Sequence, residues 1–594
     1  MAYSLPCTSH EASSHVGLQT TLSSKRKVSE MSSEESESED ELDQLNIPKY
    51  VELERPEPEF IPEPWLVDTP RSKQKKPKPV IISPSVAASL DRTKTSDRSA
   101  TYVLASTAQS LGHDVGKMTL SRQSIRRSRM KFRKIIAERI KADFSPNHPL
   151  TIHWDGKMMA DIVGKEVVDR LPIIVSGGES DQLLVVGKLA RGGTGEQMAT
   201  AICNTIDEWG IGERIRAMCF DTTSSNTGCR NGACVLLEQN LEKELLYFAC
   251  RHHIHELILE AVFSVCMRVP TSGPDVQLFK RFQNQWQFID QDNFDHGLLD
   301  MGFNATTVAD IVHFCKDQLE QFQPRDDYRE FLELTIIILG GIPKRGIRFI
   351  APGALHRARW MAKAIYSLKI WLFRSQFTLT RTEVNGIKSL NSWLIRYYVK
   401  SWFLSRCAIS APVHDLKWLK ELDALKSDQP DISKASLNKL SGHLWYLSKE
   451  LVALAFFDDK VSTETKRKMV QGLNIDGEEE PPKRITIDQS AIHAKNLEDF
   501  VSSNTRRFFQ FLHLPSEFLK NDPTEWDSIE SFCSARDIVK NLRVVNDNAE
   551  RGVSLMNEYN KLITNDEEQK QYLLQAVSEH RRQFPDCAKK LLLE

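Results

Sequence analysis

Three short apolar runs predict the start of a β-sheet after residue 149. LTIHW, RLPIIVSG and LLVVGKL are rich in β-branched and apolar residues, and turn residues separate them. Such runs are typical of strands, so we expect a three-stranded meander. The following segment, TGEQMATAICNTIDEWG, repeats its apolar residues at helical spacing behind Thr194 and Gln197, which match a capping box. A helix is therefore expected after the meander.

Two further strands alternate with helices. RIRAMCFD and LLYFAC are short apolar runs, while NGACVLLEQNL and the residues from about 252 onward have helical character. The whole order is β-β-β-α-β-α-β-α, which is that of an RNase H-like domain. We therefore expect residues 149–262 to form the first part of an α/β domain of the RNase H-like class.

The rest of the chain after this segment favours helices. Residues 263–498 are mostly helical in periodicity, for example in NSWLIRYYVKSWFLSRC, with a polar loop at DGEEEPPKR. Residues 499–594 also favour helices. Within them, the run EEQKQYLLQAVSEHRRQF at 567–584 is either a dimerisation surface or a helix that packs on its own domain.

The first 84 residues are too polar and proline-rich to pack a core. SSEESESEDELD and PEPEFIPEPW predict a disordered, acidic tail. Two basic clusters within residues 1–84, at 25–27 and 73–78, are candidate nuclear-import signals, although such short runs are also common as solvated charge. We expect a nuclear protein on this ground.

Residues 85–148 turn helical, and the second predicted helix is basic. Ser96 and Gly112 bound a first helix, and LSRQSIRRSRMKFRKIIAERIKADF predicts a second one with an apolar stripe that includes Ile125 and Ile136. We expect the opposite face to carry four cations: Arg126, Arg127, Arg133 and Lys134. Such a helix pair can dock on DNA like a helix-turn-helix, because its cations neutralise phosphates. The alternative is a solvated amphipathic helix that leads into the next domain.

The balance of charges limits how the chain can bind nucleic acid. Its 594 residues include 78 Lys and Arg against 80 Asp and Glu, so affinity for DNA has to come from local patches. The 11 cysteines lack CxxC pairs, which favours a reducing compartment over a disulfide framework. Apolar runs are too short to span a bilayer. We expect a soluble, intracellular protein without a membrane partner or a small-molecule substrate.

Two aspartates end predicted strands in the RNase H-like segment. Asp155 follows LTIHW, and Asp221 follows RIRAMCF. In this fold the first and fourth strands are neighbours, so the two carboxylates can share metal ions. Two Mg²⁺ ions roughly 4 Å apart activate the attacking oxygen and stabilise the leaving one in phosphodiester cleavage. Each residue has a structural alternative, since Asp155 with Gly156 can form a plain turn and Asp221 can cap a helix.

A third carboxylate is expected, and spacing alone does not choose among the candidates. Glu196 lies in the first turn of the first predicted helix, where the helix dipole also favours an acid. Glu256 and Glu260 follow LLYFAC, and Glu550 lies much later in the chain, within AERGVSLMNEYN.

Five short motifs resemble those of one protein family. HWDGK, CFDTTSSNTG, CRHHIHELIL, ARW and AERGVSLMNEYN occur in the order found in hAT-superfamily (hobo/Activator-type) DNA transposases. The resemblance implies that a large all-α insertion, here residues 263–498, interrupts the RNase H-like domain. It also implies that the third carboxylate belongs to a Glu-Arg-x-apolar-Ser motif, which Glu550 and the four residues after it match. Asp155, Asp221 and Glu550 are then the catalytic residues and the ligands of Mg²⁺ or Mn²⁺.

The resemblance assigns roles to further residues. Cys250 and His253 match a Cys-x-x-His motif, and support of the active site fits them better than zinc, because two ligands cannot close a tetrahedral site. Arg359 and Trp360 match an Arg-Trp motif, in which the Trp stacks on an extruded base and the Arg binds a phosphate. A Trp buried among helices is the alternative. Asn226 is a candidate to orient the second catalytic aspartate.

The expected function is that of a hAT-like DNA transposase. Such an enzyme cleaves DNA at transposon terminal repeats and transfers the strand to target DNA, and we expect a homo-oligomer. The alternative is a domesticated, transposase-derived nuclear DNA-binding or scaffold protein without catalysis. One departure from the family pattern supports that alternative: the first 149 residues contain only Cys7 and so lack a BED-type zinc finger. An exonuclease or ribonuclease H is disfavoured because Lys157 stands where exonucleases of this fold carry a second acid.

Overall fold

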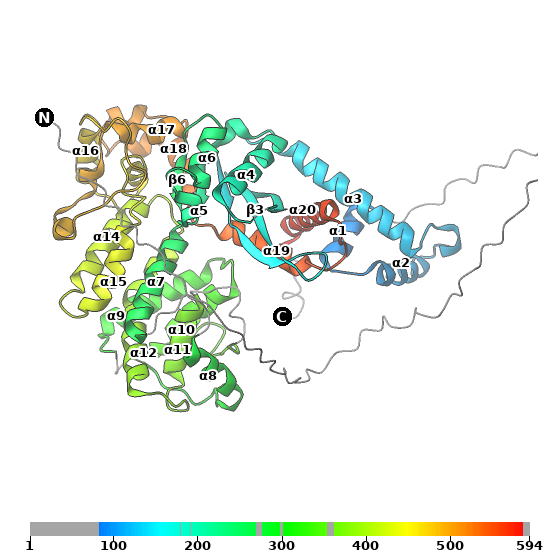
Figure 1. Cartoon of the computed structure of the whole chain (residues 1–594), viewed down its shortest axis with the longest axis horizontal. Coiled ribbons are helices and arrows are strands. Elements are labelled where there is room, and N and C mark those ends of the chain that lie inside the picture. The colour runs from blue at the N-terminus through cyan, green and yellow to red at the C-terminus, as the bar shows by residue number, and fades with distance from the viewer. Residues whose placement is uncertain are drawn as a thin grey trace, which may run out of the picture. The chain divides into compact units, whose positions relative to one another are not determined.

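The computed structural model describes residues 82–178, 180–190, 192–268, 276–297, 301–352 and 361–585 of the chain (Figure 1). All of them belong to one unit, Pro77–Glu594, and the other unit, Met1–Lys76, lies outside the described residues. The tail predicted to be disordered and its two basic clusters therefore lie outside as well, apart from the last residues before position 85. The described part is a mixed α/β fold, as expected, in which helices surround one six-stranded sheet.

The sheet is mixed. Its strands are β1 (Leu150–Trp154), β2 (Lys157–Ala160), β3 (Val167–Gly177), β4 (Ser180–Lys188), β5 (Ile215–Phe220) and β6 (Leu246–Ala249). β3 pairs antiparallel with β1, β2 and β4, whereas β5 runs parallel to both β1 and β6. The predicted meander is confirmed with one addition. After a break at Asp155 and Gly156, β2 continues in the direction of β1 and pairs with the first residues of β3.

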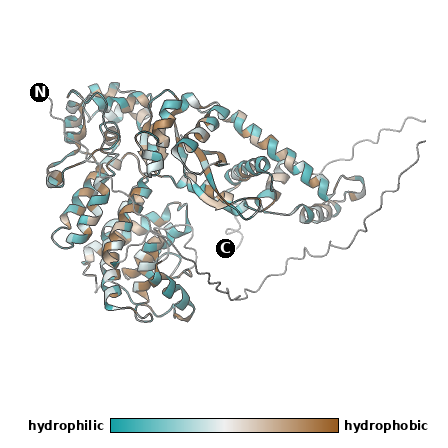
Figure 2. Ribbon diagram, in the orientation of Figure 1, coloured by the Kyte–Doolittle hydropathy of each residue, from teal (hydrophilic) through white to brown (hydrophobic). Residues whose placement is uncertain are grey.

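Each face of the sheet is covered by different helices, because successive strand residues point to opposite sides. Ile173 of β3 packs in one core with Ile202 of α4 (Gly195–Trp209), and Ile174 packs in a second core with Met556 of α19 (Asp547–Tyr559). Apolar residues follow the strands and alternate with polar ones along the helices (Figure 2). At the start of α4, Thr194 accepts the backbone N–H of the predicted capping-box partner, three residues on, at 3.3 Å.

Helices fill the chain between β6 and α19. They are α7 (Arg251–Met267), α8 (Gln277–Gln285), α9 (Ala305–Glu320), α10 (Asp326–Ile338), α11 (Met361–Leu372), α12 (Arg381–Trp393), α13 (Val399–Leu404), α14 (Ala411–Ala424), α15 (Pro430–Ser441), α16 (Thr463–Gly472), α17 (Arg506–Phe511) and α18 (Glu530–Lys540). Their interior buries large aromatic residues such as Trp393, Trp402 and Trp418. The predicted helical character is thus confirmed. Within the described ranges, no helix has the length and apolar composition needed to cross a membrane.

Three helices precede the sheet, and two of them pack beside α20 (Glu567–Gln583). They are α1 (Pro84–Arg92), α2 (Asp97–Ser110) and α3 (Arg122–Asp143). As predicted, Ser96 caps α2 by accepting the N–H of Ser99 at 3.0 Å, and Gly112 adopts a φ of 81° just beyond its end. α1 and α3 both contact α20, which also packs on β4. The apolar face of α20 is therefore covered within the chain, in keeping with the second of the two alternatives for residues 567–584.

The expectation that Arg133 lies on the exposed face of α3 is wrong. Its side chain is buried, and Nε and Nη2 both donate to the carboxylate of Asp91 on α1, each at 2.7 Å. Arg129 donates to the same carboxylate at 2.6 and 3.0 Å. A buried acid on the neighbouring helix thus holds two arginines inside. The other three predicted cations are exposed: Arg126, Arg127 and Lys134.

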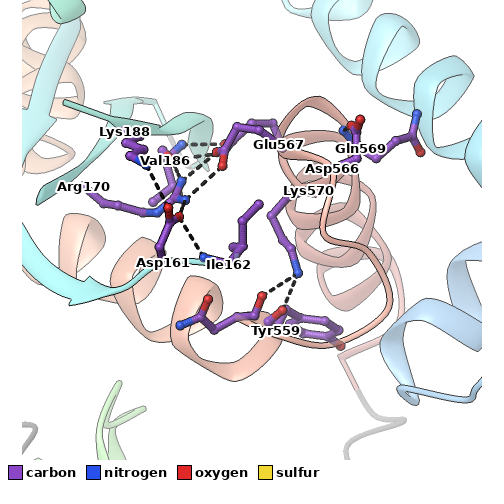
Figure 3. A network of polar contacts seen from close by, with 12 residues as sticks. Asp161, Ile162, Arg170, Val186, Lys188, Tyr559, Asp566, Glu567, Gln569 and Lys570 are labelled. Carbon is purple, nitrogen blue, oxygen red and sulfur yellow. Dashed lines mark hydrogen bonds and ion pairs between the residues drawn. The ribbon is translucent and has the colours of Figure 1, made fainter. Parts of the chain in front are cut away.

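A network of ion pairs around the buried Arg170 fastens α20 to the sheet (Figure 3). Arg170 of β3 donates to Glu567 at 2.6 and 2.9 Å and to Asp161 at 3.2 Å. Lys188 of β4 reaches the other oxygen of Asp161 at 2.8 Å. Lys570 of α20 donates to three backbone carbonyls at the C-terminal end of α19. The network therefore also fixes the position of α19, the helix that carries Glu550.

Candidate active site

Asp155 and Asp221 come together at one edge of the sheet. The register of the parallel strands β1 and β5 pairs His153 with Cys219, so the residues two positions further on, just past each strand, lie at the same level. The side chain of Asp221 is 27% exposed, and Asp155 is half-buried. Neither structural alternative, a turn at Asp155 or a helix cap at Asp221, applies. The chain does not reverse at Asp155, and the short helix after Asp221, α5 (Ser224–Thr227), has a different residue at its N-cap.

Asn226 ties the two strand ends together. Its Oδ1 accepts the indole N–H of Trp154 at 2.9 Å, and its Nδ2 donates to the backbone oxygen of Asp221, also at 2.9 Å. Asn226 is buried, and Trp154 stacks on Phe220 with ring centres 5.8 Å apart. One side chain therefore bonds the last residue of β1 and the first residue after β5. It fixes the position of Asp221 through the backbone, not through the carboxylate.

Glu550 reaches the same edge from α19. It lies in the first turn of this helix, which packs on β1, β3 and β4. Burial raises the pKa of Glu550, Asp547 and Asp155 raise it further, and the guanidinium of Arg325 acts against them. The side chain nevertheless keeps 39% of its surface exposed, so solvent screens part of this effect. Glu550 is thus close enough to Asp155 to feel its charge while it stays accessible from outside.

His253 and Glu256 of α7 lie beside the aspartates. Nδ1 of His253 is 3.7 Å from a carboxylate oxygen of Asp221 and 4.0 Å from one of Glu256. Burial lowers the pKa of His253 to about 4, which keeps its ring neutral at pH 7. Burial also raises the pKa of Glu256, and the charges of Glu550 and Asp221 add to that rise. Glu256 and Glu550 therefore both lie in the group of acidic side chains around Asp221. Glu196, in contrast, is exposed on α4.

Cys250 connects the strands with the start of α19. Its backbone N–H donates to the oxygen of Phe220 at 2.8 Å, and its Sγ accepts the N–H of Asn546 at 3.2 Å. The side chain of Asn546 in turn donates to the oxygen of Trp154 at 2.6 Å. Burial raises the pKa of the Cys250 thiol well above its usual value. These contacts place Cys250 in a supporting position.

A polar cluster below the first turn of α19 escaped prediction. Asp547 accepts the Nδ1–H of His252 at 2.7 Å and the hydroxyl of Tyr328 at 3.2 Å. Burial alone would raise the pKa of Asp547, but His252 and Arg406 hold it well below its usual range. The run CRHHIHELIL shows that several histidines lie close together in the sequence, but Asp547, the partner of His252, is 295 residues away. No local pattern connects the two.

The donors at this edge of the sheet suit a hard divalent cation. In the part of the chain that is described, no three His, Cys, Asp or Glu side chains are gathered into a ready-made metal site. However, Asp155, Asp221 and Glu550 all offer carboxylate oxygens, the ligands that Mg²⁺ and Mn²⁺ prefer. Burial raises the pKa of Asp221 to about 6, and Asp155 raises that of Glu550. A bound cation would offset the cost of keeping these neighbouring carboxylates ionised. The residues therefore fit the expected ion, provided that the ion pair between Glu550 and Arg325 opens.

The predicted DNA contacts are only partly described. Arg359 and Trp360 lie outside the described residues. On α3, Arg126 and Arg127 are exposed, and Lys134 is exposed with Nζ 3.9 Å from a carboxylate oxygen of the next-turn glutamate. The exposed face of α3 is therefore cationic, although Arg133 does not contribute to it.

No protein-family model matches the chain, and no curated protein matches it. Its function is therefore argued from the site itself.

Proposed function

We propose that the chain is a hAT-type DNA transposase, an enzyme that uses Mg²⁺ or Mn²⁺ to cleave DNA at transposon ends and to transfer the strand to target DNA. The observation that carries this proposal is the meeting of Asp155, Asp221 and Glu550 at one sheet edge. Glu550 arrives on a helix that returns to the sheet only after the whole helical block. Such a return is what the family resemblance requires of its third carboxylate.

The topology supports an RNase H-like class for the sheet. Across the sheet, the order of the strands is β4, β3, β1, β5 and β6, and β2 extends β1 along β3. Antiparallel pairing connects β1, β3 and β4, and parallel pairing connects β1, β5 and β6. Helices α4, α6 (Ala233–Asn240) and α7 follow β4, β5 and β6 in the expected order. We infer that helices α8 to α16, which lie within residues 263–498, belong to the insertion.

The residues around the carboxylates hold them ready for a cation. When bound, the metal ions would activate the attacking oxygen and stabilise the leaving one. Asn226 fixes the backbone at Asp221, and Asn546 fixes the end of β1 before Asp155. The neutral ring of His253 adds no positive charge beside Asp221, so it does not compete with a cation for this carboxylate. Preorganised ligands of this kind lower the cost of assembling the site.

The exposed cations of α3 are the proposed track for the DNA backbone. The helix has 22 residues, so it is about 33 Å long, which is close to one turn of duplex DNA. Its exposed arginines and lysine can neutralise phosphates, and the chain as a whole has no excess of positive charge to do so. In this proposal Arg359 and Trp360 keep the roles that the resemblance gives them, as phosphate and base contacts.

A second candidate function is that of a transposase-derived nuclear DNA-binding or scaffold protein without catalysis. One observation favours it: Glu550 already has a cationic partner, the guanidinium of Arg325, without a metal. In such a protein the carboxylates would be held by structural contacts alone, and the cations of α3 would still bind DNA.

Cleavage of DNA that flanks the protein's own coding sequence distinguishes the two functions. A supercoiled plasmid that carries both flanks is incubated with purified protein and Mg²⁺ or Mn²⁺, and nicking is followed on a gel. The proposal expects metal-dependent nicking by the wild type, no nicking by Asp221→Asn, and normal nicking by Asp317→Asn, which changes an exposed aspartate on α9. If the wild type and Asp221→Asn bind this DNA but are equally inactive, the protein is not an active transposase.

A further inference from the structure

The helical block places a cation inside the carboxylate site. Arg325 directly precedes α10, and its Nη1 donates to Oε2 of Glu550. Its side chain is only 19% exposed. Withdrawing a guanidinium from water is costly, so a functional role can explain why Arg325 is held against a proposed catalytic carboxylate.

Asp327 holds the guanidinium of Arg325 in a fixed orientation. Nε and Nη2 donate to its two carboxylate oxygens at 3.0 and 2.6 Å, which is a bidentate pairing. The ring of Tyr328 lies 5.0 Å from the guanidinium carbon, and the Tyr328 hydroxyl bonds Asp547 in the first turn of α19. Two of the three guanidinium nitrogens are therefore anchored to the start of α10, and the third is directed at Glu550.

We propose that Arg325 binds a non-bridging oxygen of the DNA phosphodiester, and that Glu550 occupies the place of this anion when no metal or DNA is bound. Guanidinium groups recognise carboxylates and phosphates by the same paired N–H donors. A metal ion bound to Glu550 would weaken the attraction between this carboxylate and Arg325, because the metal ion and the guanidinium are both cations and repel each other. Asp327 would still hold the guanidinium, and Nη1, released from Glu550, would face the phosphate.

This inference rests on the proposed function, since it names the phosphodiester group as the ligand of the same site. It adds a cation that neither the strand ends nor the motifs of the family resemblance indicated. An arginine at this place would stabilise the charge that develops on the phosphate during cleavage. The loss of one such preorganised donor typically lowers kcat by about 10²–10³-fold.

The test measures how tightly the full-length protein binds a small phosphodiester, thymidine 5′-monophosphate p-nitrophenyl ester, by ligand-observed NMR with Ca²⁺ present or absent. Arg325→Gln removes the cation, and Arg325→Lys keeps a charge next to Glu550 and so preserves the fold. Arg329→Gln is the matched control, an arginine one turn further along α10. Asp221→Asn tests the metal site, and circular-dichroism melting checks that every variant is folded.

The inference expects binding by the wild type that weakens at least about tenfold in Arg325→Gln, weakens partly in Arg325→Lys and is unchanged in Arg329→Gln. If binding depends on Ca²⁺ and Asp221 but not on Arg325, the inference is overturned while the proposed function stands. If binding depends on Arg325 but is indifferent to Ca²⁺ and to Asp221→Asn, the phosphate contact stands and the metal-dependent function fails. Wild-type protein that binds no probe in either condition overturns the inference.

Discussion

The buried pairing of Asp91 with two arginines makes a quantitative prediction about the helices that precede the sheet. Asp91 is fully buried on α1, and its carboxylate accepts four N–H donors from Arg129 and Arg133 of α3. Replacing Asp91 by Ala removes the acceptor and leaves two buried guanidinium groups behind. Breaking a buried ion pair from one side typically costs about 3–5 kcal/mol, since the remaining charge stays desolvated.

The contacts that remain decide where in this range the cost falls. Arg129 still donates to Asp97 at 2.6 Å and to the backbone oxygen of Thr95 at 2.9 Å. Arg133 loses the carboxylate that accepts both its Nε and its Nη2. Most of the cost therefore comes from Arg133, and we expect about 3 kcal/mol for Asp91→Ala. Adding Arg133→Leu removes that buried charge and should recover at least about 1 kcal/mol.

Hydrogen exchange measures this local stability without assuming that the whole chain unfolds in one step. A loss of about 3 kcal/mol lowers the protection of slowly exchanging amides in α1 and α3 by roughly 100-fold. Protection in α14, which lies in the helical block, serves as the internal reference. The reasoning is refuted if Asp91→Ala changes protection in α1 and α3 by less than about threefold, or if the double variant is less protected than Asp91→Ala alone.

Three further predictions concern DNA binding, helix capping and pH. The combined replacement of Arg126, Arg127 and Lys134 by Gln should weaken DNA binding and lower the slope of log K against log salt by up to about 3, and an unchanged slope would show that α3 is not the DNA track. Lys570→Met leaves three carbonyls at the end of α19 without their buried donor; we expect a loss of roughly 3 kcal/mol in urea unfolding, and a loss below about 0.5 kcal/mol would contradict the capping role. Burial holds the pKa of His255 well below its ordinary value of 6.5, so the unfolded chain binds this proton first and stability falls as the pH drops below 6.5. His255→Phe should therefore reduce the stability lost between pH 7.5 and 5.5 by about 1.4 kcal/mol, and an unreduced loss would show that His255 does not drive it.

The sheet and its two aspartates were predictable because their signals are local. Strand alternation and turn residues depend on neighbours in sequence, so the positions of β1, β3, β4, β5 and β6 followed from the chain. Asp155 and Asp221 were found because each follows an apolar run directly. The extra strand β2 was missed, since KMMADIVGK lacks alternation and forms a strand only by pairing with β3.

The remaining features depend on contacts between distant segments. Arg133 was placed on the wrong face of α3 because helical periodicity treats every arginine as a surface residue, whereas Asp91 on another helix draws it inside. Arg325 carried no signal at all, because its partner Glu550 lies 225 residues further along the chain. Only the family resemblance singled out Glu550, since four glutamates had comparable local surroundings in sequence.

The central claim is that Asp155, Asp221 and Glu550 hold divalent metal ions. Electron paramagnetic resonance of free Mn²⁺ during titration with the full-length protein counts the ions bound and gives their affinity. The account predicts that the wild type binds Mn²⁺, that Mg²⁺ competes for it, and that Asp221→Asn and Glu550→Gln each weaken binding by at least about tenfold, as loss of a carboxylate ligand should. Wild-type protein that binds no Mn²⁺, or that binds it as tightly as both variants do, would contradict the account.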